Sequence, residues 1–161
     1  MGIEIERKYL IATDDWRDLA EGVDYRQGYL STVKERTVRV RTVGEQGFLT
    51  IKGVSLGATR AEFEYEIPVQ DAHELLDELC LRPLIEKRRF KLPFAGGLIW
   101  EIDEFFGENH GLIVAEVELE SESQSIDLPS WIGEEVTGDP RYFNANLVAN
   151  PFTAWGDQDE G

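Results

Sequence analysis

Residues 3–11 of the chain read IEIERKYLI, and this stretch decides the fold class. Four of its five odd-numbered positions are apolar, while the even positions 4, 6 and 8 carry Glu, Glu and Lys. Alternation with a period of two is typical of a β-strand whose two faces differ in chemistry. The stretch therefore predicts a strand with one apolar face and one charged face.

The same alternation recurs along the chain between glycine-rich breaks. It predicts seven further strands, over residues 26–31, 36–43, 47–53, 59–67, 84–92, 98–105 and 112–120. Helices are predicted only over residues 14–22, 70–80 and 139–150, the last with Asp139 as its N-cap and Pro140 at its first position. The connections are mostly short, which favours antiparallel pairing. The fold class is therefore α+β and β-dominated, and eight antiparallel strands tend to curl and close because closure hides their edges.

Length and composition exclude several classes of protein. The chain has 161 residues, which predicts a single domain over 1–161 with a frayed tail at 155–161. Its net charge of −16 argues against a nucleic-acid or anionic-membrane partner. One cysteine and two histidines exclude a disulfide framework and make a Cys- or His-based metal site improbable. No run approaches the ~18 apolar residues of a membrane helix, so we expect a cytoplasmic protein.

The charged strand faces carry the functional information. Each strand alone is compatible with a charged face in contact with solvent. The charges are segregated, however, with bases on some strands and acids on others, while the first strand carries both signs as Glu4, Glu6 and Lys8. If the sheet closes with its apolar face outward, these residues line the interior: bases 8, 39, 41, 52, 87 and 89, and acids 4, 6, 62, 64, 101, 103, 116 and 118. Such an interior needs water, metal ions and a polyanion, because unpaired buried charges are costly.

The chemistry of these groups indicates phosphoryl transfer. Clustered carboxylates without His or Cys are hard oxygen ligands that suit Mg²⁺ or Mn²⁺. Clustered Arg and Lys side chains in the same cavity suit phosphate oxygens. Together they form the combination that phosphoryl transfer requires.

The same residues resemble a known family. Glu4-Ile5-Glu6-Arg7-Lys8 matches the ExExK signature of the CYTH superfamily, also called triphosphate tunnel metalloenzymes. Further matches follow in the family's order: Arg39-Val40-Arg41, Lys52, Glu62-Phe63-Glu64, Lys87-Arg88-Arg89, Glu101-Ile102-Asp103 and Glu116-Val117-Glu118. The closing segment 135–144 resembles the short bacterial members. The resemblance implies an eight-stranded antiparallel barrel that forms a tunnel, with a few helices outside.

The resemblance also implies individual roles. Substrate-binding bases would be Lys8, Arg39, Arg41, Lys52, Lys87 and Arg89. Glu4, Glu6 and Glu118 would hold the metal ion that orients the substrate. Glu62, Glu64 and Asp103 would organise a second metal ion or the attacking water. Glu116 is included among the metal-site carboxylates. Glu101 and Glu120 lie on the same strand face, where they would either support the metal ligands or lie near the tunnel mouth.

Two residues bear on catalysis within the family. The short bacterial tripolyphosphatases have a Tyr and a Lys at places that match Tyr29 and Lys52, which would act as a catalytic pair. The alternative for Tyr29 is an ordinary strand aromatic, and the alternative for Lys52 is a phosphate clamp.

The resulting hypothesis is metal-dependent hydrolysis of inorganic tripolyphosphate to pyrophosphate and phosphate, with Mg²⁺ or Mn²⁺ as cofactor. The partner would be a small-molecule triphosphate, and the protein a monomer or homodimer. Three alternatives stay open: a class IV adenylate cyclase, a thiamine triphosphatase and a non-catalytic polyphosphate-binding module. The segment 139–150 is expected to pack at one tunnel end and gate it.

Overall fold

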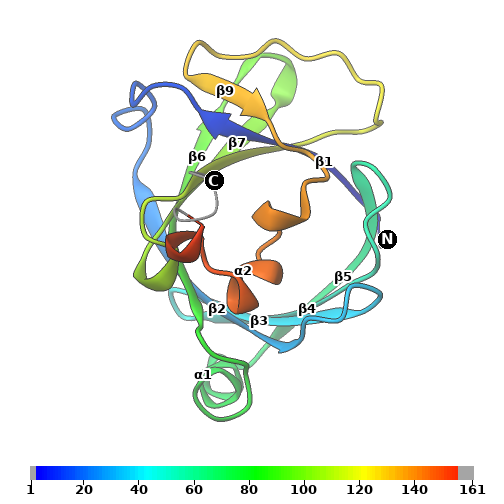
Figure 1. The fold of residues 1–161 in the computed structure, drawn as a ribbon, viewed down its shortest axis with the longest axis vertical. Coiled ribbons are helices and arrows are strands. Elements are labelled where there is room, and N and C mark those ends of the chain that lie inside the picture. Colours follow the sequence, from blue (N-terminus) through cyan, green and yellow to red (C-terminus); the bar gives the residue numbers. More distant parts are fainter. Residues whose placement is uncertain (1–2, 156–161) are drawn as a thin grey trace.

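A single antiparallel sheet that closes on itself dominates the computed structural model, which describes residues 3–155 (Figure 1). Its barrel strands are β1 (Ile3–Ile11), β2 (Gly22–Ser31), β3 (Thr37–Val43), β4 (Gln46–Lys52), β5 (Thr59–Ile67), β6 (Ile85–Pro93), β7 (Ile99–Phe105) and β8 (Ile113–Glu118). Around the barrel they follow the order β5-β4-β3-β2-β6-β7-β8-β1, and β1 pairs back with β5. The predicted closed eight-stranded antiparallel barrel is therefore confirmed.

The first strand has three neighbours. Its residues 3–5 pair with β5, residues 6–10 pair with β8, and Tyr9 and Ile11 pair with an additional strand, β9 (Ile132–Glu135). We did not expect β9 from the sequence, because four residues are too few to show a clear alternation. β9 continues the sheet on the side of β1 where the pairing with β5 has ended.

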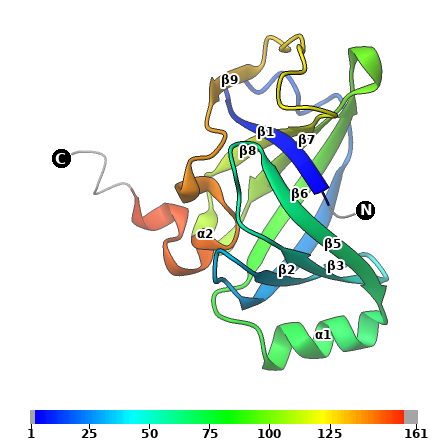
Figure 2. The ribbon, with the colours of Figure 1, turned by 90° about the vertical axis from the view of Figure 1, so that its right-hand side faces the viewer.

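Apolar residues cover the outside of the barrel, and this orientation leaves the charged faces inside. Trp100 and Ile102 of β7 are fully buried, and Trp100 meets Trp131 edge-on with ring centroids 5.8 Å apart. On the opposite side, α1 (Val69–Glu78) lies across β3 and β4 and buries Ala72 and Leu76 (Figure 2). Successive residues of a strand point to opposite faces, so these contacts turn the charged positions toward the barrel axis.

The segment after β9 lies over one mouth of the barrel (Figures 1 and 2). It forms η3 (Pro140–Tyr142), α2 (Asn146–Ala149) and η4 (Phe152–Ala154) instead of the single helix predicted over 139–150. The backbone is extended at Phe143, with φ −70° and ψ 128°, which separates η3 from α2. The expected cap is present, since the Asp139 carboxylate accepts a hydrogen bond from the Arg141 amide.

Two other boundaries differ from the prediction. Residues 14–22 form isolated turns because Trp16 inserts edge-on against Phe90 in the core, and the chain then enters β2 already at Gly22. Trp155, predicted to begin a frayed tail, is 4% exposed and packs against Tyr142. The rest of that tail lies outside the described residues.

The remaining elements fit the expected pattern. The helix predicted over 70–80 is confirmed as α1, and short 3-10 turns occur as η1 (Ala95–Gly97) and η2 (Gly107–Asn109). No helix within residues 3–155 is long and apolar enough to cross a bilayer.

The contact between α1 and β4 is tight enough to test. A Cβ added at Gly47 would lie 2.8 Å from the Ala72 Cβ and 3.1 Å from the Ile67 carbonyl oxygen. We therefore expect Gly47→Ala to lower the free energy of unfolding by about 1–3 kcal/mol, because the helix must shift to admit the methyl group. Urea denaturation measures this change.

Gly53→Ala is the matched control. Its added Cβ would meet the Ala61 Cβ at 3.4 Å, an ordinary contact, so we expect a change within about 0.5 kcal/mol. Equal stability of the two variants would contradict the close approach of α1.

Candidate active site

A cavity of about 630 Å³ lies inside the barrel. The charged residues that line it are Glu4, Glu6, Lys8, Lys34, Arg39, Arg41, Lys52, Arg60, Glu62, Glu64, Lys87, Arg89, Glu101 and Glu116. All six bases predicted to bind substrate are in this set. Five of the seven predicted metal-site carboxylates are also in it, whereas Asp103 and Glu118 are not. The alternation along the strands therefore brings charged residues from β1, β3, β4, β5, β6, β7 and β8 to one interior surface.

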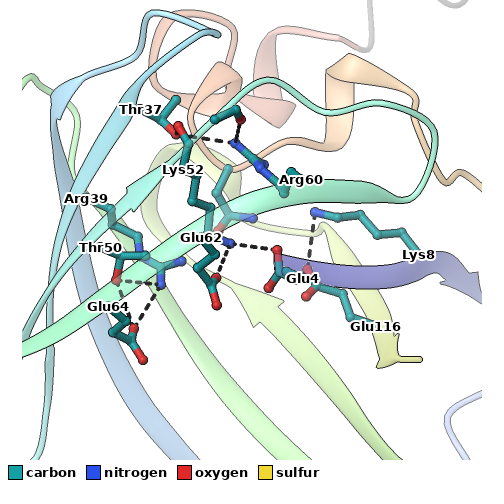
Figure 3. A network of polar contacts seen from close by, with 12 residues as sticks. Glu4, Lys8, Thr37, Arg39, Thr50, Lys52, Arg60, Glu62, Glu64 and Glu116 are labelled. Carbon is teal, nitrogen blue, oxygen red and sulfur yellow. Dashed lines mark hydrogen bonds and ion pairs between the residues drawn. The ribbon is translucent and has the colours of Figure 1, made fainter. Parts of the chain in front are cut away.

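Lys52 joins two strands on one side of the cavity. Its Nζ atom lies 3.2 Å from a Glu4 carboxylate oxygen and 3.0 Å from a Glu62 oxygen (Figure 3). Lys52 is therefore held between β1 and β5, with its ammonium group in the cavity. No hydrogen bond in the described structure joins it to Tyr29.

A second group of contacts surrounds Glu64 (Figure 3). One carboxylate oxygen of Glu64 lies 3.5 Å from Arg39 Nη2 and 3.1 Å from Arg41 Nη2, and it accepts a hydrogen bond from Thr50 Oγ1 at 2.9 Å. Arg41 is desolvated and lies near Arg39 and Arg89, which lowers its pKa to about 10. The crowding of like charges makes this part of the cavity attractive to an anion.

Asp103 is the most deeply buried acid of the site, with 1% of its side chain exposed. It accepts hydrogen bonds from Lys87 Nζ at 2.8 Å and from Arg89 Nε and Nη2 at 2.7 and 2.9 Å. Burial opposes ionisation of Asp103, but Arg89 and Lys87 hold its pKa below the ordinary value. Burial also lowers the pKa of Lys87 to about 7, against the attraction of Asp103. Both carboxylate oxygens of Asp103 are therefore engaged by the two bases.

Lys8 of β1 and Glu116 of β8 form another ion pair inside the barrel. Lys8 Nζ lies 3.2 Å from Glu116 Oε1, and it also donates to the Tyr142 carbonyl at 3.5 Å. Burial of Glu116 opposes ionisation, but Lys8, Arg89 and Lys87 hold its pKa well below the ordinary value. Lys8 thereby connects the cavity wall to the segment that covers the mouth.

Glu6, which lines the cavity, and Glu118, which is exposed outside its lining, differ from the paired carboxylates. They face each other in the β1–β8 register, and within residues 3–155 neither has a Lys or Arg nitrogen within 4.0 Å. Burial raises the pKa of Glu6 well above its ordinary value, and the charges of Glu116 and Glu4 add to the effect. Burial and nearby Glu62 also raise the pKa of the exposed Glu118.

This group of acids fits a cation. Carboxylates that repel one another and lack a basic partner gain most from a divalent ion, and their oxygens are the ligands that Mg²⁺ and Mn²⁺ prefer. In the described part of the chain, no three Asp, Glu, His or Cys side chains are already close enough to form a complete metal cage. The donor chemistry of Glu6 and Glu118 thus suits the ion, and Glu4, which also contacts Lys52, is the third oxygen donor on this side of the cavity.

Sequence reasoning missed several residues of the cavity wall. Asn144 accepts hydrogen bonds from Gln27 Nε2 at 3.0 Å and from Lys87 Nζ at 3.2 Å, and the Phe143 ring lies 5.7 Å from Lys8 Nζ. A single helix predicted over 139–150 gave no reason to place these residues inside the barrel. Arg60 was missed although it shares its strand face with Glu62, so the alternation alone was sufficient to find it.

Tyr29 lines the cavity near the hydrogen bond between Gln27 and Asn144. It is 4% exposed, and its hydroxyl oxygen accepts a hydrogen bond from Gln27 Nε2 at 3.5 Å. It also packs in the apolar cluster that includes Phe105 and Leu112. Tyr29 therefore has both a packing contact and a polar contact at the cavity wall.

Comparison with known proteins agrees with this arrangement. An inorganic triphosphatase of Acetivibrio thermocellus is 54% identical over 152 residues, covering 94% of this chain and 97% of its own. An inorganic triphosphatase of Nitrosomonas europaea is 39% identical over 148 residues, covering 90% and 96%. A crystal structure of an inorganic triphosphatase aligns with a TM-score of 0.64 at 35% identity, covering 89% of this chain and 96% of that one.

The family model named CYTH domain matches residues 2–150, which include every charged residue of the cavity. The expected resemblance is thereby confirmed over nearly the whole described structure. The chain belongs to the CYTH domain family.

Proposed function

We propose that this protein hydrolyses inorganic tripolyphosphate to pyrophosphate and phosphate inside the barrel. The observation that carries the proposal is the convergence of the six predicted bases on one cavity that also contains carboxylates, one of which, Glu6, has no basic partner within residues 3–155. Basic side chains alone would bind any polyanion. A protein that only binds polyphosphate has no need of carboxylates among these bases, so their presence favours an enzyme. The relatives described as inorganic triphosphatases support the same choice.

Substrate binding is the task of the basic side chains. Arg39 and Arg41 enter from β3, Lys87 and Arg89 from β6, and Lys52 from β4. Guanidinium groups bind phosphate oxygens with two parallel hydrogen bonds, and ammonium groups bind them as point charges. Asp103 is better suited to positioning than to metal binding, because it fixes the side chains of Lys87 and Arg89. We assign Lys52 as a phosphate clamp, since Glu4 and Glu62 already hold its ammonium group.

Glu4, Glu6 and Glu118 would hold the cofactor, Mg²⁺ or Mn²⁺. When bound, the ion neutralises phosphate charge and polarises the reacting phosphoryl group. Glu116 contacts Lys8 and would support the neighbouring ligand Glu6. Binding of the ion also relieves the repulsion between the carboxylates of β1 and β8.

Glu62 and Glu64 lie on β5, which pairs with the start of β1, and are the candidates to orient the attacking water. The water oxygen forms a bond to a terminal phosphorus, and the bond from that phosphorus to the bridging oxygen breaks. Pyrophosphate leaves with the electron pair of that bond, and the proton of the water passes to a carboxylate and then to solvent. Tyr29 would hydrogen-bond a phosphate oxygen from the cavity wall. Most of the rate comes from positioning and from electrostatic stabilisation.

Product analysis tests the proposal directly. Equal concentrations of tripolyphosphate, ATP and thiamine triphosphate are incubated with Mg²⁺, Mn²⁺ or EDTA, while phosphate and cyclic AMP are measured. We expect metal-dependent phosphate release from tripolyphosphate and little from the other two. Cyclic AMP formation from ATP, preference for thiamine triphosphate, or binding of tripolyphosphate without turnover would each contradict the proposed reaction.

Arg39 provides a test of the substrate-binding assignment. It is 9% exposed, lines the cavity and contacts Glu64, so Arg39→Ala removes a cation from the wall. We expect a loss of tripolyphosphatase activity of about tenfold or more, with the barrel still folded by circular dichroism.

Arg88→Ala is the matched control for Arg39→Ala. Its side chain is 46% exposed and pairs with Asp24 outside the cavity, so we expect activity close to that of the wild type. Similar rates for both variants would refute the assignment of Arg39.

Glu6 and Glu118 test the metal site. We expect Glu6→Gln and Glu118→Gln to raise the Mn²⁺ concentration for half-maximal activity by about tenfold or more, because each removes an anionic ligand. Electron paramagnetic resonance of Mn²⁺ measures the weakened binding without turnover. Glu134→Gln on β9 serves as control, because Glu134 is exposed and lies on the additional strand, outside the β1–β8 register that places Glu118 opposite Glu6. Unchanged Mn²⁺ binding in both Glu6→Gln and Glu118→Gln would show that the ion binds elsewhere.

A further inference from the structure

Arg60 is the exception among the bases that line the cavity. Every other such base in residues 3–155 lies within 4.0 Å of a carboxylate: Lys8, Lys34, Arg39, Arg41, Lys52, Lys87 and Arg89. Arg60 has only neutral partners, because its Nη2 donates to Thr37 Oγ1 at 3.3 Å and to the Gly53 carbonyl at 3.2 Å. Its positive charge is therefore not neutralised within the described chain.

The guanidinium of Arg60 also has unused hydrogen-bonding capacity. Its Nε atom is buried and has no hydrogen-bond partner in the described structure. An Arg side chain stays charged at every physiological pH, and a partly buried charge without a counter-ion is unfavourable. An anion in the cavity would satisfy both the charge and the free donor.

Arg60 extends the set of bases in one direction. It lies on β5, on the same strand face as Glu62 and Glu64. Figure 3 shows it on the side of Lys52 opposite to Glu64. Thr37, which accepts the hydrogen bond from Arg60, donates in turn to the Lys52 carbonyl at 3.2 Å. A polyphosphate chain that runs along Arg39 and Lys52 would therefore reach Arg60 with one of its ends.

We propose that Arg60 is a substrate-binding residue that holds the phosphate group at one end of a linear polyphosphate. The proposal rests on the proposed function, since it places an additional phosphate contact in the same cavity. Binding at Arg60 breaks no ion pair, unlike binding at Arg39 or Lys52, each of which exchanges a carboxylate for a phosphate. The end group is the terminal phosphate of tripolyphosphate or the fourth phosphate of a longer chain, and both offer the guanidinium the same oxygens.

Two variants of Arg60 separate its charge from its structural contacts. Arg60→Gln keeps an amide donor for the Gly53 carbonyl but removes the charge, whereas Arg60→Lys keeps the charge. Arg36→Ala is the matched control, because it removes one positive charge from the exposed turn before β3 without changing the cavity lining. Kd values for tripolyphosphate and tetrapolyphosphate are measured by calorimetry in EDTA, and KM and kcat are measured with Mg²⁺.

We expect Arg60→Gln to raise the Kd and KM of at least one of the two polyphosphates by about tenfold, with kcat nearly unchanged and part of the loss restored in Arg60→Lys. A loss with both polyphosphates places Arg60 at the terminal phosphate of tripolyphosphate. A loss with tetrapolyphosphate alone places it at the fourth phosphate. Unchanged affinity for both, or the same loss in Arg36→Ala, would overturn the proposal.

Failure of the proposed function would be distinguishable from failure at Arg60. If the wild-type protein binds tripolyphosphate but does not hydrolyse it, the proposed reaction is wrong. The Kd values in EDTA still decide the role of Arg60 in that case, because they do not depend on turnover. If the wild-type protein hydrolyses tripolyphosphate and the Arg60→Gln variant matches it in Kd and KM, only the inference about Arg60 fails.

Discussion

Mutual neutralisation of charges inside the barrel is the interaction on which this structure depends. Taking a carboxylate or an ammonium group out of water costs several kcal/mol unless a well-placed partner compensates. Asp103 shows how the barrel meets this requirement, because Lys87 and Arg89 bind both of its oxygens in a site that is almost fully buried. The pairs join neighbouring strands, so the same contacts that make the charges tolerable also hold the side chains in fixed directions.

The exceptions to this neutralisation indicate where ligands bind. Within the described residues 3–155, Glu6 and Glu118 lack a basic partner, and Arg60 lacks an acidic one. A divalent cation and a polyphosphate would supply the two missing charges at once. The remaining bases already have partners, so substrate binding there is an exchange of one anion for another. A cavity whose groups are positioned before the substrate arrives needs little reorganisation during the reaction.

The outer layer determines which way the strands face. Trp16, Trp100 and Trp131 cover one side of the barrel, and α1 covers the other through Ala72 and Leu76. Because successive residues of a strand point to opposite faces, these apolar contacts turn the charged positions between them toward the inside of the barrel. The same contacts explain why residues 14–22 are not a helix, since Trp16 must reach Phe90 within a short connection to β2. Helix propensity in such a segment is weaker than the gain from burying an indole ring.

The sequence by itself determined the eight strands, the separation of charged from apolar faces and the family, because an alternation of period two survives any tertiary arrangement and the motifs are local. That the charged faces point inward was expected only if the sheet closed with its apolar face outward, which the outer layer decided. The sequence also identified six of the eight bases that line the cavity in the described structure, and missed Lys34 and Arg60. Only the tertiary structure decided which charges neutralise one another, since partners such as Lys52 and Glu4 are far apart in the chain and meet when β1 closes against β5. The break at Phe143 was likewise decided by tertiary contacts, because Lys8 and Lys87 hold the Tyr142 carbonyl and the Asn144 side chain at the barrel mouth. Pairing across a closed barrel depends on distances in space, and a single sequence contains only distances along the chain.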